Sequence, residues 1–527
     1  MPASSVIPQA TPTPVCRADP TTRSLARLGS APRLLLIGCV ALIVLIAGMR
    51  AWVCWGNDAW LNHPAGVLIS MASDLKAGVF YRPIYGPAGY GGTRYFPLYF
   101  VLQAALMKLG MPILLSAYVL SAAAVGALLA GMFCLLRALG VESWLAACST
   151  GALLAANCAQ YSLFSPHADG LACALNVWAL VFVTRPKLTR GKVAIAALLF
   201  TLAWSAKLTT VFGFAAAFVW LLGIGLAPMA WALAVETICG YLMVAAALVL
   251  GSEGRFWEIL KACASGGTSL LGAVAAPLNM LMVAARLDQG ILWFAALAVL
   301  ALAQVAMSGK FLRNLPALLF VATLAVTAFI YGTPGVNDNH LIDLQVASLL
   351  LIAAQLSHAA TARQKQWGIA VLALMVLASG VPALRHFKNH DLRFHRQRFQ
   401  QVLARIGDSH RPILAENPIV PLLAGQQAYV ADPWMLRLLR TRIPGLGNPL
   451  LAGLHNRAFG AVVLCMADPS TSYGRWWYET QQFGPGFQAA LTQNYRLVAT
   501  VDDQKIYLPI SGELPGDPSA GPASPGK

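Results

Sequence analysis

The chain has 527 residues, of which 58% are hydrophobic and only 11% are charged, and its formal net charge is +16. Soluble globular domains carry about 25% charged residues, so this composition predicts a polytopic membrane protein and excludes one large soluble core. The positive charge is typical of cytoplasmic loops and lipid contacts, and no basic, aromatic nucleic-acid module is visible. The ten cysteines contain no CxxC pair, so they indicate neither a zinc site nor a disulfide framework.

The N-terminal segment predicts a cytoplasmic tail followed by a membrane anchor. Residues 1–33 are basic and rich in Pro, Ser and Thr, which is typical of a disordered tail. Residues 34–55 are apolar and too long for the core of a cleaved signal, so they predict a retained signal anchor. The polar, aromatic and glycine-rich loop that follows, 56–112, is therefore expected on the outer side.

The positive-inside rule decides the remaining topology. If the short apolar segment 96–110 crossed the bilayer, the basic run Arg185–Lys192 would face outward. If that segment lies at the interface instead, every basic loop faces the cytoplasm. We therefore expect an interfacial segment 96–110, and an outer segment 252–288 made of an interfacial helix and a mobile or re-entrant part. This choice gives about 11 spans, at 34–55, 113–136, 144–163, 168–184, 193–206, 208–226, 229–251, 290–308, 315–332, 340–358 and 367–384.

The composition changes sharply after Arg385, where charged residues cluster and short apolar runs alternate with helix-like stretches. The pattern predicts a periplasmic α/β domain over residues 386–510, after a transmembrane domain of 34–385 and before a disordered tail of 511–527. Strands are expected at 412–417, 427–432, 461–468 and 495–501, and helices at 433–440 and 486–494.

The first outer loop carries two candidate catalytic residues, Asp58 and His63. A carboxylate at Asp58 could bind a metal, orient a phosphate-bearing substrate or act as a general base, or it could simply cap the following helix. His63 could carry a proton or anchor the loop at the interface. Residues 63–78 are expected to form an amphipathic helix along the membrane surface.

Basic residues near the outer face are candidate ligands for a phosphate. Arg82 and Arg94 lie among glycines and aromatic residues that include Tyr81 and Tyr95, and guanidinium groups can bind phosphate with two hydrogen bonds. Anchoring to lipid headgroups is the alternative. Lys207 at a span end could compensate a lipid phosphate or extend toward the interface, and Arg255 lies in the outer segment.

Two further motifs place polar residues where spans begin on the outer side. Asp169 follows His167 in SPHAD, and ionisable groups at membrane depth are costly and usually functional, although Asp169 could also cap the helix. Asn339, His340 and Asp343 occur in GTPGVNDNHLIDLQ, with His340 and Asp343 on one face of a helix start. These residues are candidates for substrate binding.

The order of these motifs resembles the bacterial C-type (GT-C) membrane glycosyltransferases, the superfamily of protein O-mannosyltransferases and the aminoarabinose transferase of lipid A. The matching features are the signal anchor, an outer loop with an acidic residue, the pattern A-x-D-L-x-x-G-x-x-Y, YFPLYF, SPHAD, Lys207, NDNHLID and the tail AENP…AYVADPW…YLP. They span most of residues 34–510, and their order and sidedness are more specific than any single motif.

The resemblance implies a multi-pass enzyme of the bacterial inner membrane that takes a sugar from a polyprenyl-phosphate donor on the periplasmic side, with inversion. It implies roles for Asp58 and Asp169 as acids of the first and second outer loops, and for Lys207 and Arg94 in holding the donor phosphate. Ala65 stands where many relatives carry an acid, so Asp58 or His63 must substitute. Some relatives use a divalent metal such as Mg²⁺ or Mn²⁺, for which Asp58 and Asp169 are the candidates.

Two other functions are compatible with such a sequence. A flippase or transporter of lipid-linked sugars would need an inward-facing polar path and symmetry between halves, neither of which is visible. A non-catalytic envelope assembly protein would use the C-terminal domain to bind a partner. The sequence identifies neither the sugar nor the acceptor, which could be a lipid, a glycan or a protein.

Overall fold

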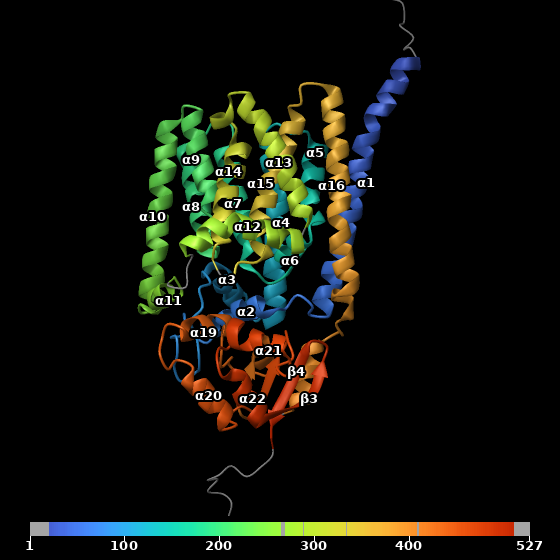
Figure 1. Cartoon of the computed structure of the whole chain (residues 1–527). Coiled ribbons are helices and arrows are strands. Elements are labelled where there is room, and N and C mark those ends of the chain that lie inside the picture. The colour runs from blue at the N-terminus through green and yellow to red at the C-terminus, as the bar shows by residue number, and fades with distance from the viewer. Residues whose placement is uncertain (1–19, 265–268, 288, 334, 408–409, 511–527) are drawn as a thin grey trace, which may run out of the picture.

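The helical domain and the C-terminal domain are stacked, and the first outer loop lies between them (Figure 1). The computed structural model describes residues 20–264, 269–287, 289–333, 335–407 and 410–510. The helical domain comprises α1 (Pro20–Gly56), α2 (His63–Lys76), α3 (Leu98–Lys108), α4 (Ile113–Ala138), α5 (Ser143–Gly151), η1 (Ala152–Ala155), α6 (Asn157–Phe164), α7 (Ala168–Val183), α8 (Arg190–Ala206), α9 (Phe212–Gly223), α10 (Ala227–Gly251), α11 (Arg255–Ala264), α12 (Leu270–Leu287), α13 (Gln289–Met307), η2 (Phe311–Arg313), α14 (Leu315–Ile330), η3 (Asp338–Leu341), α15 (Ile342–Ser357) and α16 (Ala362–Asn389). Helix α1 thus begins at Pro20, inside the segment expected to be a tail.

The described helices are those of a polytopic membrane protein. Seven of them are long and apolar enough to cross a membrane, or eight if the pair α6 and α7, bent by 95°, forms one span. The span expected at 144–163 is divided into α5, η1 and α6. Conversely, α12 is long and apolar enough to cross, although it lies in the segment expected outside. The count of 11 spans therefore stays a prediction.

Helices α1 and α16 run side by side in the same direction and define the two ends of the helical domain (Figure 1). At the end where α16 begins, Lys365 pairs with Glu142 in the loop between α4 and α5. At the other end, Arg50 of α1 pairs with Asp391 just after α16, at 2.5 Å. The C-terminal domain follows directly from this second end, which we call the domain-bearing end.

Helix α2 is enclosed between the two domains instead of lying free on a surface. Its residues from Ala65 to Ala72 are all buried. On one side, a Cβ atom added to Gly66 would lie 2.3 Å from Oδ1 of Asn417 in the C-terminal domain, so the glycine permits this close approach. The helix is capped by Asn62, whose Oδ1 accepts a hydrogen bond from the Ala65 N–H at 3.1 Å. The capping role considered as the alternative for Asp58 is therefore filled by Asn62.

The C-terminal domain is an α/β unit with a four-stranded mixed sheet of order β1-β2-β4-β3. Strand β1 is parallel to β2, and β4 is antiparallel to both of its neighbours. The elements are η4 (Asp391–Arg393), α17 (Arg398–Ile406), β1 (Ile413–Ala415), α18 (Ile419–Leu423), α19 (Pro433–Arg440), α20 (Asn448–His455), β2 (Ala461–Leu464), α21 (Ser472–Trp476), η5 (Trp477–Gln481), α22 (Phe487–Asn494), β3 (Tyr495–Val501) and β4 (Gln504–Pro509). The tail expected at 511–527 lies outside the described residues.

One strand prediction is wrong, and its actual partner explains why. Residues 427–432 pair with the first outer loop instead of the sheet, because the Tyr90 N–H donates to the Tyr429 carbonyl at 2.7 Å and the Ala431 N–H donates to the Tyr90 carbonyl at 2.9 Å. The fourth strand is supplied by β4, which the sequence did not suggest. The helices expected at 433–440 and 486–494 form as α19 and α22.

An apolar cluster fixes the two domains to each other beside the site described below. It contains Val67 of α2, Phe100 of α3, Phe256 of α11 and Leu439 of α19, all buried. Because side chains from four elements interlock, α19 is held against the helical domain. This packing determines which residues of the C-terminal domain can take part in a site.

Candidate active site

A buried lysine lies between two carboxylates at the domain-bearing end of the helical domain. Lys207 ends α8, where its backbone leaves the helix in an extended conformation. Its Nζ atom lies 2.7 Å from Oδ1 of Asp169 in the first turn of α7 and 3.0 Å from Oδ2 of Asp343 in the first turn of α15. All three side chains are at most 10% exposed. The structure therefore brings together three candidate residues that the sequence predicts at the ends of separate helices.

Further polar groups donate hydrogen bonds to the two carboxylates. Asn339 Nδ2 donates to the second oxygen of Asp169 at 3.2 Å, and the Cys173 thiol donates to Asp343 Oδ1 at 2.7 Å. Buried charges of this kind destabilise a protein unless they are paired, since desolvation is costly. We call Asp169, Lys207, Asn339 and Asp343 the Lys207 network.

Two histidines beside the Lys207 network have buried ring nitrogens with no hydrogen-bond partner among the described residues. Both nitrogens of His167 are in this state, although Nδ1 lies 4.0 Å from Oδ2 of Asp169. The Nδ1 atom of His340 is buried and unpartnered as well, while the ring interacts electrostatically with Lys207 and Asp169. Buried polar atoms are nearly always satisfied, so these three nitrogens make the surroundings of the Lys207 network a candidate site for a polar ligand.

The first outer loop contributes Tyr95 and Arg94 to the same neighbourhood. Desolvation raises the pKa of Tyr95, the negative charges of Asp432 and Asp169 raise it further, and the positive charge of Arg94 opposes them. Arg94 lies over the ring of Trp434, 4.8 Å from its centroid, and so makes a cation–π contact with the C-terminal domain.

Residues at the start of α19 form part of the site, and sequence reasoning missed them. The buried Asp432 caps α19, and its Oδ1 atom also lies 3.4 Å from Nε2 of His63. Arg437 lies over the ring of Trp434, 5.4 Å from its centroid. Its Nε atom is buried without a hydrogen-bond partner among the described residues. The motif ADPW was noted only as part of a resemblance, although an Asp before a Pro-started helix is itself a capping signal.

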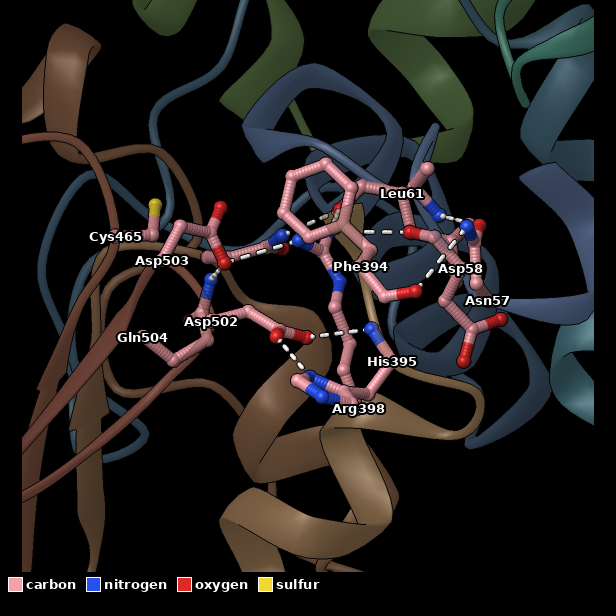
Figure 2. Close-up of polar contacts among 12 residues, drawn as sticks. Asn57, Asp58, Leu61, Phe394, His395, Arg398, Cys465, Asp502, Asp503 and Gln504 are labelled. Atoms are coloured by element: carbon pink, nitrogen blue, oxygen red, sulfur yellow. Dashed lines mark hydrogen bonds and ion pairs between the residues drawn. The ribbon is translucent and has the colours of Figure 1, made fainter. Parts of the chain in front are cut away.

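Asp58 belongs to a different set of contacts, which Figure 2 shows. Its carboxylate accepts a hydrogen bond from the Tyr118 hydroxyl at 3.0 Å and points away from Arg398, which instead binds the Asp58 main-chain carbonyl at 3.0 Å (Figure 2). Burial raises the pKa of the Asp58 carboxyl above its ordinary 3.8, and the Tyr118 hydrogen bond and Arg398 partly offset that rise. Arg398 also binds Asp503 at 2.9 Å, so it ties the first outer loop to the sheet.

The three other predicted residues have structural contacts of their own. The Arg82 guanidinium is taken up by Asp74 at 2.7 Å, by Ser70 and by the Ala428 carbonyl. The Tyr81 hydroxyl donates to the Tyr95 carbonyl at 2.8 Å and so supports that loop. Arg255 lies on α11 and pairs with the exposed Glu253 at 3.5 Å. None of these contacts joins them to the Lys207 network.

The two aspartates considered for a divalent metal do not fit one. Within the part of the chain that the structure describes, neither Asp58 nor Asp169 belongs to a group of three or more His, Cys or carboxylate ligands close enough to share an ion. Asp169 is already bound by the Lys207 ammonium and the Asn339 amide. Asp58 and Asp169 therefore have no metal-binding role in the reaction proposed below.

The fold is similar to that of known membrane glycosyltransferases. No family model and no curated protein matches the chain. The Archaeoglobus fulgidus oligosaccharyltransferase in its apo form aligns with 86% of this chain and 72% of its own, at a TM-score of 0.53 and 11% identity. ArnT from Cupriavidus metallidurans bound to undecaprenyl phosphate aligns with 89% and 98%, at 0.48 and 14%. The A. fulgidus AglB in complex with an inhibitory peptide and a dolichol-phosphate aligns with 91% and 75%, at 0.49 and 12%. The likeness to the apo oligosaccharyltransferase confirms, at the level of the fold, the resemblance drawn from the sequence.

Proposed function

We propose that this protein is a membrane glycosyltransferase that moves a sugar from a polyprenyl-phosphate donor to a lipid, glycan or protein acceptor. The observation that carries the proposal is the Lys207 network together with the unpartnered nitrogens of His167 and His340. These groups meet where the helical domain, the first outer loop and the C-terminal domain come together. A donor with an apolar tail and a charged head suits such a boundary, and the shared fold supports the same class of reaction.

The donor phosphate would be bound by cations that converge on the site. Lys207 supplies an ammonium, while Arg94 and Arg437 bring guanidinium groups that both contact the ring of Trp434. Negative charge grows on the phosphate as its bond to the sugar breaks, so fixed cations in a water-poor site stabilise that transition state. For Lys207 this means exchanging part of its contact with Asp169 and Asp343 for contact with the donor.

The acceptor would be activated by His63, with Asp432 holding the ring. In this reaction the acceptor oxygen or nitrogen forms a bond to the anomeric carbon, the carbon–oxygen bond to the phosphate breaks, and the proton of the acceptor passes to His63. Displacement from the side opposite the phosphate inverts the anomeric centre. A histidine that faces a buried carboxylate can accept a proton while the carboxylate holds its ring in place. Asp58 is the second candidate base, and its contacts with Tyr118 and Arg398 lie elsewhere.

The orientation in the membrane follows the same proposal. The basic residues of the loops at the other end, such as Lys365, would face the cytoplasm, and the domain-bearing end would face the periplasm of a bacterial inner membrane. Donor and acceptor would then meet outside the cytoplasm, where lipid-linked sugars replace nucleotide sugars.

The test is a transfer assay with the full-length protein in proteoliposomes. A panel of radiolabelled polyprenyl-phosphate sugars is supplied together with extracted envelope lipids, glycans or proteins as acceptors. We expect label to appear in one acceptor class together with free polyprenyl phosphate. Movement of intact donor across the bilayer without free polyprenyl phosphate would identify a flippase, and no turnover with any donor would contradict the proposal.

A further inference from the structure

A second polar cluster lies away from the proposed active site, at the point where α16 leaves the helical domain. His386 lies in the last turn of α16, His390 is the C-cap residue of that helix, and Asp391 follows directly. The two imidazole rings are stacked, with their centroids 4.6 Å apart. The ligand atoms of the three residues all lie within 4.8 Å of one another. The Asp391 Oδ1 atom is 3.1 Å from Nδ1 of His390 and 3.6 Å from Nε2 of His386.

We propose that His386, His390 and Asp391 form a binding site for a divalent transition-metal ion of the Zn²⁺ class. Two imidazoles and one carboxylate are a ligand set that Zn²⁺ and its neighbours bind, at about 2.0–2.2 Å. The side chain of His386 is 43% exposed and that of His390 is 53% exposed. An ion can therefore reach both rings from solvent, and a water molecule can serve as a further ligand. The Asp391 side chain is fully buried, so it provides a fixed base for the site.

The surroundings of Asp391 position it for this role. Arg50 of α1 binds its other oxygen, Oδ2, at 2.5 Å and is itself held by Asn157 and Gln160 at 2.7 and 2.8 Å. This arrangement turns Oδ1 toward the two histidines. A buried guanidinium nearby weakens attraction for a second cation, but the negative end of the α16 helix dipole favours one. We therefore expect weaker binding than at a structural zinc site with four protein ligands.

An ion bound here would stabilise the connection between the helical domain and the C-terminal domain. The three ligands lie at the end of α16, and the segment after them leads through Phe394 and Arg398 to the sheet. Arg398 already ties this segment to the first outer loop (Figure 2). A metal bound at this connection would add a further constraint and raise the temperature at which the protein unfolds, because it binds only the folded arrangement.

The experiment uses full-length protein purified in detergent without a polyhistidine tag and stripped with EDTA. Calorimetric titration with ZnCl₂ and the visible absorption of added Co²⁺ measure binding, and tryptophan fluorescence follows thermal unfolding. We expect one ion per chain and a rise in the unfolding temperature of the wild type. His386→Asn and His390→Asn should each weaken binding by at least about 10–100-fold, the loss known for groups that only support a ligand, and the double variant should not bind.

Matched controls separate this site from unspecific binding to histidine. His455→Asn alters an exposed histidine on α20, and His395→Asn alters an exposed histidine whose Nδ1 atom contacts Asp502, so both should bind as the wild type does. Because both site histidines are half-exposed, their variants are expected to fold, and size-exclusion profiles verify it. The proposal is overturned if the wild type binds no ion, or if the folded double variant binds like the wild type. Neither readout depends on glycosyl transfer.

Discussion

At the scale of single residues, the candidate site depends on one cation between two anions. Lys207 neutralises only part of the charge of Asp169 and Asp343, so the group keeps a formal excess of one negative charge before Arg94 and Arg437 are counted. In the proposed reaction, the donor phosphate would therefore need the positive charge of Arg94 and Arg437 as well. The same balance makes each member sensitive to substitution.

Lys207→Met should destabilise the protein strongly. Removing the ammonium leaves two buried carboxylates without their cation, and breaking a buried pair in this way costs about 3–5 kcal/mol. The matched control is Arg190→Met, which breaks the more exposed pair with Glu236 and should cost at most about 1 kcal/mol. Denaturant unfolding in detergent measures both. Equal losses for the two variants would show that Lys207 is not held as described.

Substitutions of Asp58 and His63 test which of the two residues is the general base. The raised pKa of Asp58 means that the folded state favours the neutral carboxyl, so its contribution to stability falls as the pH rises through 3.8 and the raised value. Asp58→Asn removes that penalty and should leave stability at pH 7 unchanged or higher. We expect this variant to retain transfer, whereas His63→Asn should lose about 100-fold or more. The reverse pattern of activities would assign the base to Asp58.

At the scale of elements, the site forms because helix ends and loops from distant parts of the sequence meet. The sequence could identify Asp169, Lys207 and Asp343, since ionisable residues at the ends of apolar segments are rare and conspicuous. It could not identify Asp432 or Arg437, because their role depends on how α19 docks against the helical domain. It also placed residues 427–432 in the sheet, since a local pattern cannot show that a strand-like segment pairs with a loop more than 300 residues earlier.

The loop before η3 should tolerate no side chain at Gly335. This residue has φ +82°, and an added Cβ atom would lie 2.6 Å from the ring of Trp434. Gly335→Ala should therefore combine backbone strain of about 1–2 kcal/mol with displacement of the ring that Arg94 and Arg437 contact. Gly78→Ala is the control, since Gly78 has φ +91° but no atom within 4 Å of the added carbon. Comparable transfer rates in the two variants would contradict a role for this contact.

At the scale of the whole molecule, the helical domain and the C-terminal domain enclose α2 between them. The composition was enough to predict a polytopic membrane protein, and the order of motifs was enough to predict the fold. The division of segment 144–163 into short bent helices was not predictable, because a continuous apolar run does not reveal where a helix breaks. The same holds for α2, whose amphipathic pattern indicated a membrane surface although a protein domain covers it.

The measurement that tests the central claim most directly is the rate of transfer by Asp169→Asn in proteoliposomes. Asparagine has nearly the same shape but cannot balance the charge of Lys207, so we predict a loss of about 100-fold or more with a folded protein. Glu142→Gln, at the opposite end of the helical domain, should react at the wild-type rate. Full activity of folded Asp169→Asn would contradict the assignment of the active site to the Lys207 network.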